Sequence, residues 1–207
     1  MRTDRIKDIF KNHISLPYET KAPSAVLVPL MEIDGEINVI FTQRALHMVH
    51  QPGDICFPGG HHENSEIPVE TAIRETCEEL GIKPENIEIF GRPDFMLTKY
   101  GAYVIPFVGL IKGMLPKDFS VNPDEVEKVI TIPLKFFMEN EPLKSYIELK
   151  REFPKDFPFD MIYGGKNYKF APIREFHYFY DYNGIYIWGL TAKIIKNTAD
   201  IIKESIT

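Results

Sequence analysis

The feature that most constrains this chain is a spaced pattern of glycine, arginine and acidic residues at positions 60–82. Gly60 is followed by five residues and Glu66, and then by seven residues and Arg74, which begins the run Arg-Glu-Thr-Cys-Glu-Glu-Leu-Gly-Ile. This run holds three carboxylates within five residues: Glu75, Glu78 and Glu79. Glutamates three or four residues apart destabilise a bare helix by roughly 0.2–0.5 kcal/mol per pair. The interpretation we favour is that a divalent metal carrying a phosphorylated substrate neutralises them.

The periodicity of this segment predicts a helix over residues 66–80. With about 100° between successive residues, one side of the helix is apolar or small: Val69, Ala72, Ile73, Thr76, Cys77 and Leu80. The three glutamates are expected on roughly the opposite side, with Arg74 at its edge. Gly81 follows at the position where helices commonly end with glycine. The alternative is an acidic face solvated by water and paired with Arg74, but the fixed spacing of the whole pattern favours a metal site.

The donor chemistry indicates hard divalent cations. Oxygen-rich clusters are the usual setting for Mg²⁺ or Mn²⁺, which keep several waters and bridge to substrate phosphates. The run Phe57-Pro58-Gly59-Gly60 predicts a strand end and a tight loop, where glycine lets the backbone approach a ligand or metal. His61 and His62 are interpreted as loop residues, because histidine-rich sites favour zinc and similar metals.

The same residues resemble the signature of the Nudix hydrolase superfamily. That signature is G-x5-E-x7-R-E-U-x-E-E-x-G-U, where U is a bulky aliphatic residue, and every named position matches except the first U, which is Thr76 here. We call residues 60–82 the box. The resemblance implies an α/β fold of the Nudix type, an α/β/α sandwich with a central mixed sheet. It also implies Mg²⁺ or Mn²⁺ as cofactor and hydrolysis of a nucleoside diphosphate linked to another group.

The resemblance further implies roles for individual residues. It implies the following metal ligands: Glu75, Glu78, Glu79 and the backbone carbonyl of Gly59. Glu66 and Arg74 would orient the helix, and Gly59 and Gly60 would lie against the substrate. A carboxylate beyond the box often completes such sites, and Glu125 is the candidate here, although it could equally be an exposed loop residue. The general base therefore stays open between a box carboxylate and Glu125.

Segments outside the box resemble the coenzyme A (CoA) pyrophosphatase branch of the superfamily. That branch has L-L-T-x-R-S-x-x-L-R-x-H-x-G-Q-V-x-F-P-G-G before the box and I-W-G-L-T-A near the end, matching residues 41–60 and 187–192. Residues 122–126 and 132–134 also resemble it, so the similarity spans most of residues 25–195. Four polar positions of the branch pattern are replaced here: its Ser, Arg, His and Gln fall on Ala45, Val49, Gln51 and Asp54.

The resemblance implies CoA or a derivative as substrate, split into 3′-phosphoadenosine 5′-phosphate and a 4′-phosphopantetheine compound. ADP-ribose or another nucleoside diphosphate derivative stays open, and so does a Nudix-fold ligand sensor without turnover, which the intact box disfavours. Arg44 is expected to hold a phosphate, because arginine binds phosphate bidentately; a surface salt bridge is the alternative. Trp188 is interpreted as a packed aromatic at a helix start rather than a ring that stacks on substrate.

Length and composition are those of an ordinary soluble domain. The 207 residues are 44% hydrophobic and 26% charged, and we expect one Nudix hydrolase domain over residues 1–207. A net charge of −6 and a pI near 5.6 argue against nucleic-acid or anionic-membrane partners. A small nucleotide is the expected partner, and a homodimer is an open possibility. No secretion signal or membrane span is recognisable. Cys56 and Cys77 are expected to be reduced, packed thiols, which favours a cytoplasmic location.

The rest of the chain predicts alternating strands and helices. An amphipathic helix is expected at residues 1–14, carrying Ile6, Ile9 and Phe10, and turns are expected at Asp34-Gly35 and Asn183-Gly184. Further helices are expected at residues 134–140 and 187–206, and a loop at 122–126. Strands are expected at residues 24–33, 37–43, 55–57, 87–96, 103–111, 146–150, 168–172 and 176–182.

Overall fold

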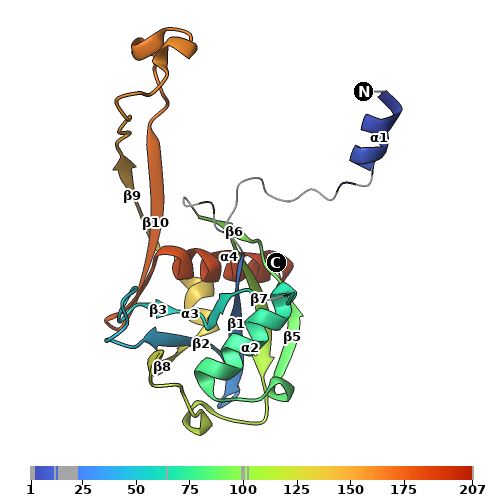
Figure 1. Cartoon of the computed structure of the whole chain (residues 1–207). Helices are drawn as coiled ribbons and strands as arrows, with labels where there is room; N and C mark the ends of the chain where they lie inside the picture. The colour runs from blue at the N-terminus through green and yellow to red at the C-terminus, as the bar shows by residue number, and fades with distance from the viewer. Residues whose placement is uncertain are drawn as a thin grey trace.

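The computed structural model describes residues 3–11, 13, 23–63, 65–98, 101 and 103–206. Figure 1 follows these residues from the N-terminal helix to the C-terminal helix. The helices are α1 (Thr3–Lys11), α2 (Pro68–Leu80), α3 (Leu134–Glu139) and α4 (Gly189–Ile206). The strands are β1 (Ser24–Ile33), β2 (Glu36–Arg44), β3 (Ile55–Cys56), β4 (Gly59–His61), β5 (Ile87–Gly91), β6 (Met96–Leu97), β7 (Tyr103–Ile111), β8 (Val126–Pro133), β9 (Leu143–Leu149), β10 (Ile173–Tyr182) and β11 (Ile185–Trp188).

The fold is built on a mixed sheet with β1 near its centre. β1 pairs antiparallel with β2 and parallel with β7, and β8 pairs antiparallel with the other side of β2. β1 and β2 diverge at one end, where the short strands β3 and β4 pair with β2 and β1 respectively. The backbone N–H of Leu27 donates to the carbonyl of Pro58 at 2.9 Å and closes this split. The divergence places the segment before the box between two central strands.

Helices cover both faces of this sheet (Figure 1). Alternation along β1 shows why, because successive side chains of a strand point to opposite faces. Leu27 packs in one buried cluster with Ala72 of α2, and Val28 packs in another with Phe137 of α3 and Ala199 of α4. The expected α/β/α sandwich with a central mixed sheet is therefore confirmed.

A long hairpin rises from this body (Figure 1). β9 and β10 pair antiparallel over residues 143–149 and 173–179, and β10 also pairs with β11 near the base. We call residues 143–182 the arm. Two-stranded ribbons are marginal on their own in water, and here the arm's tip has its own aromatic cluster. Phe153 lies 4.8–5.1 Å, between ring centroids, from three other rings: Phe157, Phe159 and Phe170.

Most predicted elements are found at their predicted places. The strand at 24–33, the turn at Asp34-Gly35 and the helix that begins at residue 134 are confirmed. The N-terminal helix is present as α1, while residues 1, 2, 12 and 14 of its predicted range lie outside the described residues. The described thiols, Cys56 and Cys77, are unpaired, as expected.

Other element predictions were wrong. Residues 168–172 form no strand, because the return strand β10 begins only at residue 173. The predicted strand at 87–96 is two strands, β5 and β6, separated by residues 92–95. β8 was missed, and Val126 belongs to it rather than to the predicted loop. Residues 187 and 188 belong to β11, so that α4 begins at Gly189. No helix among the described residues is long and apolar enough to cross a membrane.

The packing between α3 and the sheet provides a test of the core. Phe137 is 2% exposed and its ring lies 5.8 Å from Phe41 and 5.1 Å from Tyr180. We expect Phe137→Ala to lower the free energy of unfolding by about 3–5 kcal/mol, because it removes buried surface and leaves a cavity. Urea unfolding followed by circular dichroism measures this. Tyr163→Ala at the arm tip, where the side chain is 97% exposed, is the control and should change stability by about 0.5 kcal/mol or less.

Candidate active site

Both ends of α2 are fixed by the local sequence. Pro68 occupies the first turn, and the side chain of Glu70 accepts a hydrogen bond from the backbone N–H of Ile67 at 3.0 Å. Gly81 ends the helix in the left-handed region at φ 63°, and its N–H donates to the carbonyl of Cys77 at 2.9 Å. A Cβ at Gly81 would also lie 2.0 Å from the carbonyl oxygen of Ser120. Glycine is therefore required there on two grounds.

Arg74 is the hub of the acidic side of this helix. Its Nε lies 2.8 Å from Glu66, Nη2 lies 2.9 Å from Glu75, and Nη1 lies 3.0 Å from Glu78. Nη2 also donates to the carbonyl of His61 at 3.3 Å. The hydrogen bonds from Arg74 hold the pKa of Glu66 at about 2. The geometry thus brings Glu66 and Arg74 together, as the supporting roles predicted for them require.

Glu79 points toward the sheet, and the prediction that it lies opposite the apolar side was wrong. Seven residues make almost two complete turns, so Glu79 projects beside Ala72 and is only 7% exposed. Its carboxylate accepts hydrogen bonds from the backbone N–H of Gly59 and from Oγ1 of Thr42, both at 3.2 Å. Burial is the main cause that raises the pKa of Glu79 to about 7.

Glu75 lies against the glycine loop. A Cβ at Gly60 would come within 2.4 Å of the Glu75 carboxylate, so only glycine leaves room for this side chain. A Cβ at Gly59 would lie 2.3 Å from the carbonyl oxygen of Ala25. Burial raises the pKa of Glu75 against the lowering effect of Arg74, and the nearby charges of Glu78 and Glu125 raise it further.

Glu125 and Arg44 both lie outside the box, and Glu125 is close to its carboxylates. The charge of Glu125 raises the pKa of both Glu75 and Glu79, so this exposed turn residue is close enough to act on both carboxylates. The carbonyl of Glu125 accepts a hydrogen bond from the N–H of Ala45 at 2.9 Å and ties its loop to the end of β2. Arg44 lies near Cys56, whose thiol pKa it lowers against the larger effect of burial.

Arg44 and the two histidines have defined partners. Nε of Arg44 donates to the carbonyl of His50 at 3.2 Å. His61 lies in β4 rather than in a loop, which corrects the prediction, and its Nδ1 is 2.8 Å from Oγ of Ser24. Nδ1 of His62 is 2.6 Å from Oγ1 of Thr71.

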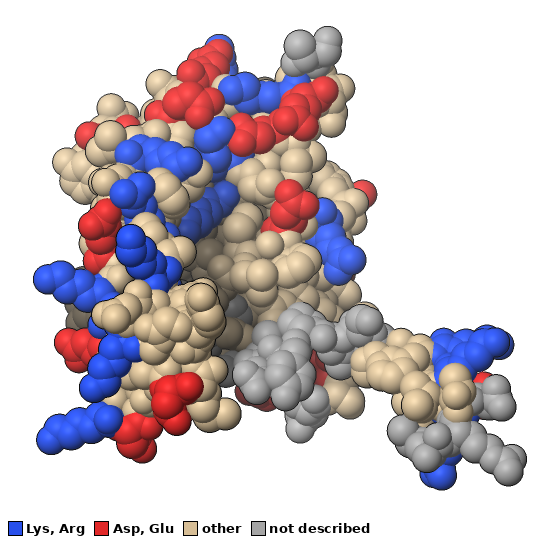
Figure 2. Space-filling view, turned by 90° about the horizontal axis from the view of Figure 1, so that it is seen from above, with Lys and Arg blue, Asp and Glu red and all other residues tan. Residues whose placement is uncertain are grey.

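Viewed from above, Lys and Arg side chains gather beside a hollow on the side where the arm rises (Figure 2).

Thr42 and Thr71 were missed by the sequence analysis. Thr71 is fully buried and donates to Oε2 of Glu66 at 2.8 Å, so it helps to hold the carboxylate that Arg74 binds. Thr42 does the same for Glu79. A threonine in a strand or helix does not by itself indicate a functional site. Only Thr71 could have been suspected, because it lies three residues before Arg74.

The donor chemistry of the site suits a hard divalent cation. Three carboxylates and a backbone carbonyl at Gly59 are the oxygen ligands that Mg²⁺ and Mn²⁺ take. Across the described residues, however, no group of three or more His, Cys, Asp or Glu side chains is arranged to hold an ion as it stands. Arg74 contacts one oxygen of Glu75 and one of Glu78. The second oxygen of each carboxylate would be available to an ion.

Comparison with known proteins identifies the family. A model of the NUDIX domain matches residues 21–157, well over half of the chain. The chain therefore belongs to the Nudix hydrolase family.

Individual relatives cover different parts of the chain. Nudix hydrolase 3 of Caenorhabditis elegans is 36% identical over 138 residues, covering 65% of this chain and 58% of the relative. The mitochondrial Nudix hydrolase 15 of Arabidopsis thaliana is 31% identical over 187 residues, covering 87% and 59%. The mouse protein named peroxisomal coenzyme A diphosphatase NUDT7 is 34% identical over 117 residues, covering 55% and 48%. The chain thus spans about half of the length of these relatives.

Solved structures resemble the chain more distantly. The Ap4A hydrolase of C. elegans in a binary complex has a TM-score of 0.47 and 21% identity, covering 56% of this chain and 83% of the other. The Nudix hydrolase RenU of M. smegmatis has a TM-score of 0.48 and 18% identity, covering 57% and 74%.

The raised pKa of Glu79 predicts how stability depends on pH in metal-free protein. The Glu79 carboxyl binds a proton more tightly in the folded state than in the unfolded state. Its contribution to the free energy of unfolding is therefore fully present below pH 4.5 and is lost as the pH rises through about 7. We expect the free energy of unfolding in EDTA to fall by about 1–3 kcal/mol between pH 5 and 8 because of this carboxyl. Urea titrations at several pH values measure the slope. Glu79→Gln should flatten it, and an unchanged slope would contradict the assignment.

Proposed function

We propose that this chain hydrolyses the diphosphate bond of CoA or CoA derivatives with Mg²⁺ or Mn²⁺, giving 3′-phosphoadenosine 5′-phosphate and 4′-phosphopantetheine compounds. The observation that supports this most is that the CoA-type segment at residues 41–60 contacts the box directly, because Thr42 and Gly59 both donate hydrogen bonds to Glu79. Arg44 belongs to the same segment, and its Nε donates to the carbonyl of His50 within it. The mouse relative named as a CoA diphosphatase, 34% identical over part of its length, also supports this substrate.

The side chains divide the work by their positions. Glu75, Glu78 and Glu79 would hold the metal, which when bound polarises diphosphate oxygens and acidifies a water. Arg44, at the end of β2, would hold a phosphate through its planar guanidinium. A carboxylate would accept the proton of the attacking water, and the candidates are Glu125 and the box carboxylates. Arg74 keeps the acidic residues of the helix in place until the metal binds.

The alternative within the family is ADP-ribose or another nucleoside diphosphate derivative. Two positions support this alternative substrate class, because Val49 and Gln51 stand where the CoA branch has Arg and His. Val49 is 89% exposed, so a positive charge that could meet substrate phosphate is missing from the surface of this loop. A ligand sensor without turnover is less well supported, because every carboxylate of the box is present and Glu79 keeps buried hydrogen-bond partners. A cytoplasmic location stays a prediction.

A substrate panel tests the proposal. We expect the purified chain with Mg²⁺ to cleave CoA with a higher kcat/KM than ADP-ribose, NADH or diadenosine polyphosphates, with products identified by mass. The physical reason is that the segments around Arg44 and Trp188 have the CoA-type pattern. If ADP-ribose is preferred, the substrate is wrong while the Nudix chemistry stands. If no member of the panel is cleaved with either metal, the enzymatic proposal fails.

Glu78→Gln tests the metal site directly. The Glu78 side chain is 54% exposed, so its replacement should leave the fold unchanged. A neutral ligand binds Mg²⁺ less well, and we expect kcat to fall by about a hundredfold or more at saturating Mg²⁺. Steady-state kinetics and a metal-free melting curve measure the two effects. Glu139→Gln on the exposed face of α3 is the matched control. Activity like that of the unmodified chain would rule out this role for Glu78.

A further inference from the structure

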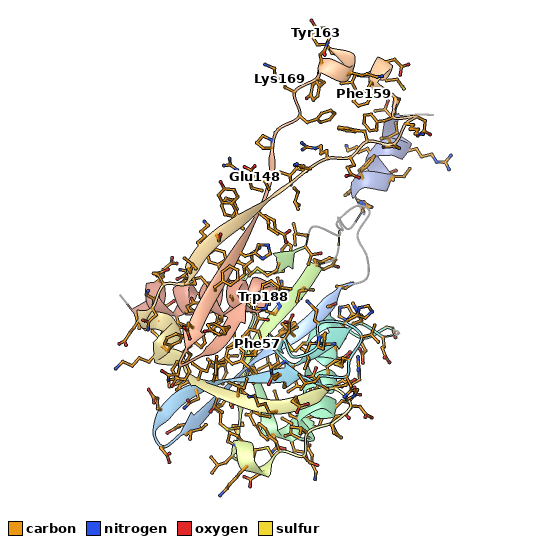
Figure 3. The ribbon with its side chains drawn as sticks, turned by 90° about the vertical axis from the view of Figure 1, so that its left-hand side faces the viewer. Phe57, Glu148, Phe159, Tyr163, Lys169 and Trp188 are labelled. Carbon is orange, nitrogen blue, oxygen red and sulfur yellow. The ribbon has the colours of Figure 1, made fainter. Side chains whose placement is uncertain are left out.

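A cavity of about 270 Å³ lies on the α4 face of the sheet, away from the box helix. Its floor is formed by β2, β3 and β8, and its wall by the hairpin that joins β10 to β11. The residues that matter for its chemistry are Gln43, Asp54, Ile55, Lys128, Tyr186 and Trp188. We call this cavity the rim pocket. Figure 3 shows Trp188 at the base of the arm, above Phe57 of the segment that leads into the box.

Strand register relates the rim pocket to the carboxylates. Gln43 of β2 stands opposite Lys128 of β8 on one side and Ile55 of β3 on the other, so these side chains share the α4 face. Thr42, one residue earlier, points to the opposite face, where it donates to Glu79. The pocket and the catalytic carboxylates therefore lie back to back across the last residues of β2.

The wall of the pocket presents aromatic rings. Tyr186 is 63% exposed and Trp188 is 42% exposed, and both point to the same side of β11 because they are two residues apart. Ile187 between them is fully buried. The Trp188 ring stacks on Phe179 at 6.2 Å with an interplanar angle of 6°, which fixes its orientation. Exposed, oriented aromatic rings are platforms on which nucleobases stack.

We propose that the rim pocket binds the base of the nucleotide substrate. Trp188 and Tyr186 stack on the base, and Lys128 meets a phosphate on its ribose. The inference rests on the proposed function in that it names where the adenosine part of that substrate lies. The volume suits one base and not a whole dinucleotide derivative, since sites for drug-sized ligands begin at about 300 Å³. The diphosphate then passes around the end of β2 to Arg44 and the box carboxylates.

Trp188 provides a direct readout, because it is the single tryptophan of the chain. In EDTA, where no turnover occurs, we expect 3′-phosphoadenosine 5′-phosphate to quench the intrinsic fluorescence saturably, whereas 4′-phosphopantetheine leaves it unchanged. AMP should bind about tenfold more weakly, because it lacks the phosphate that meets Lys128. Lys128→Met should remove most of that difference, while Lys135→Met on α3 should preserve it.

Kinetics separate stacking from structure. We expect Trp188→Leu to raise KM for CoA by about tenfold with kcat nearly unchanged, and Trp188→Phe to restore most of the loss. Tyr186→Leu, at an exposed position, should raise KM in the same direction and covers the case in which Trp188→Leu does not fold. Tyr103→Leu is the control, because Tyr103 lines a second cavity beside β5, β6 and β7. A KM effect from Tyr103→Leu, with none from Trp188→Leu or Tyr186→Leu, would overturn the proposal.

The two proposals fail in different ways. Suppose that CoA is not cleaved, but 3′-phosphoadenosine 5′-phosphate quenches Trp188 and Lys128→Met weakens its binding. The pocket proposal is then supported and the proposed reaction is wrong. If CoA is cleaved but the nucleotide neither quenches Trp188 nor binds more weakly to Tyr186→Leu in calorimetry, the base lies elsewhere and the pocket proposal is wrong. A fall in kcat at constant KM in Trp188→Leu and Tyr186→Leu would likewise contradict it.

Discussion

The acidic helix depends on one guanidinium. Arg74 contacts Glu66, Glu75 and Glu78 at 2.8–3.0 Å, and the planar fork of arginine can meet several carboxylates at once where a lysine would present a single point charge. With these charges compensated, α2 can pack its other side on the sheet. In this structure the positive charge that compensates Glu75 and Glu78 therefore comes from the protein itself.

Glu79 is held by a different arrangement, because it is buried and out of reach of that hub. Its partners are the N–H of Gly59 and the hydroxyl of Thr42, so the segment before the box and the end of β2 both contribute to one carboxylate. Burial makes the ionised form of this carboxyl unfavourable, as its pKa near 7 indicates. A nearby divalent cation would offset that desolvation cost. Gly60 completes the arrangement by leaving space for Glu75. The candidate site therefore depends on the close approach of the Gly59 and Gly60 backbone to the side chains of Glu79 and Glu75.

The sequence predicted the local features well and the distant ones poorly. The box, its helix, the β1–β2 hairpin and the resemblance to the family all rest on spacings of a few residues. The burial of Glu79 was within reach of the same helical arithmetic and was misjudged. The arm could not be predicted from such local patterns. β9 pairs with β10 across more than twenty intervening residues, and no short-range pattern encodes that register. Thr42 and Glu125 reach the carboxylates only through the pairing of β2 with β8 and the loop before it, which a periodicity cannot reveal.

The alternation of side chains along β2 connects the two proposed parts of the site. Thr42 and Gln43 are neighbours in sequence, yet one supports Glu79 and the other lines the rim pocket. A strand can place a metal-binding helix on one face and a base-binding pocket on the other with no change in its own backbone. The arm enters this arrangement at its base, where Phe179 of β10 stacks on Trp188 of β11. The pocket wall is therefore oriented by residues of the arm, while the box carboxylates are oriented by Arg74, Gly59 and Thr42. The proposed base pocket and the box carboxylates can then vary independently on the same sheet.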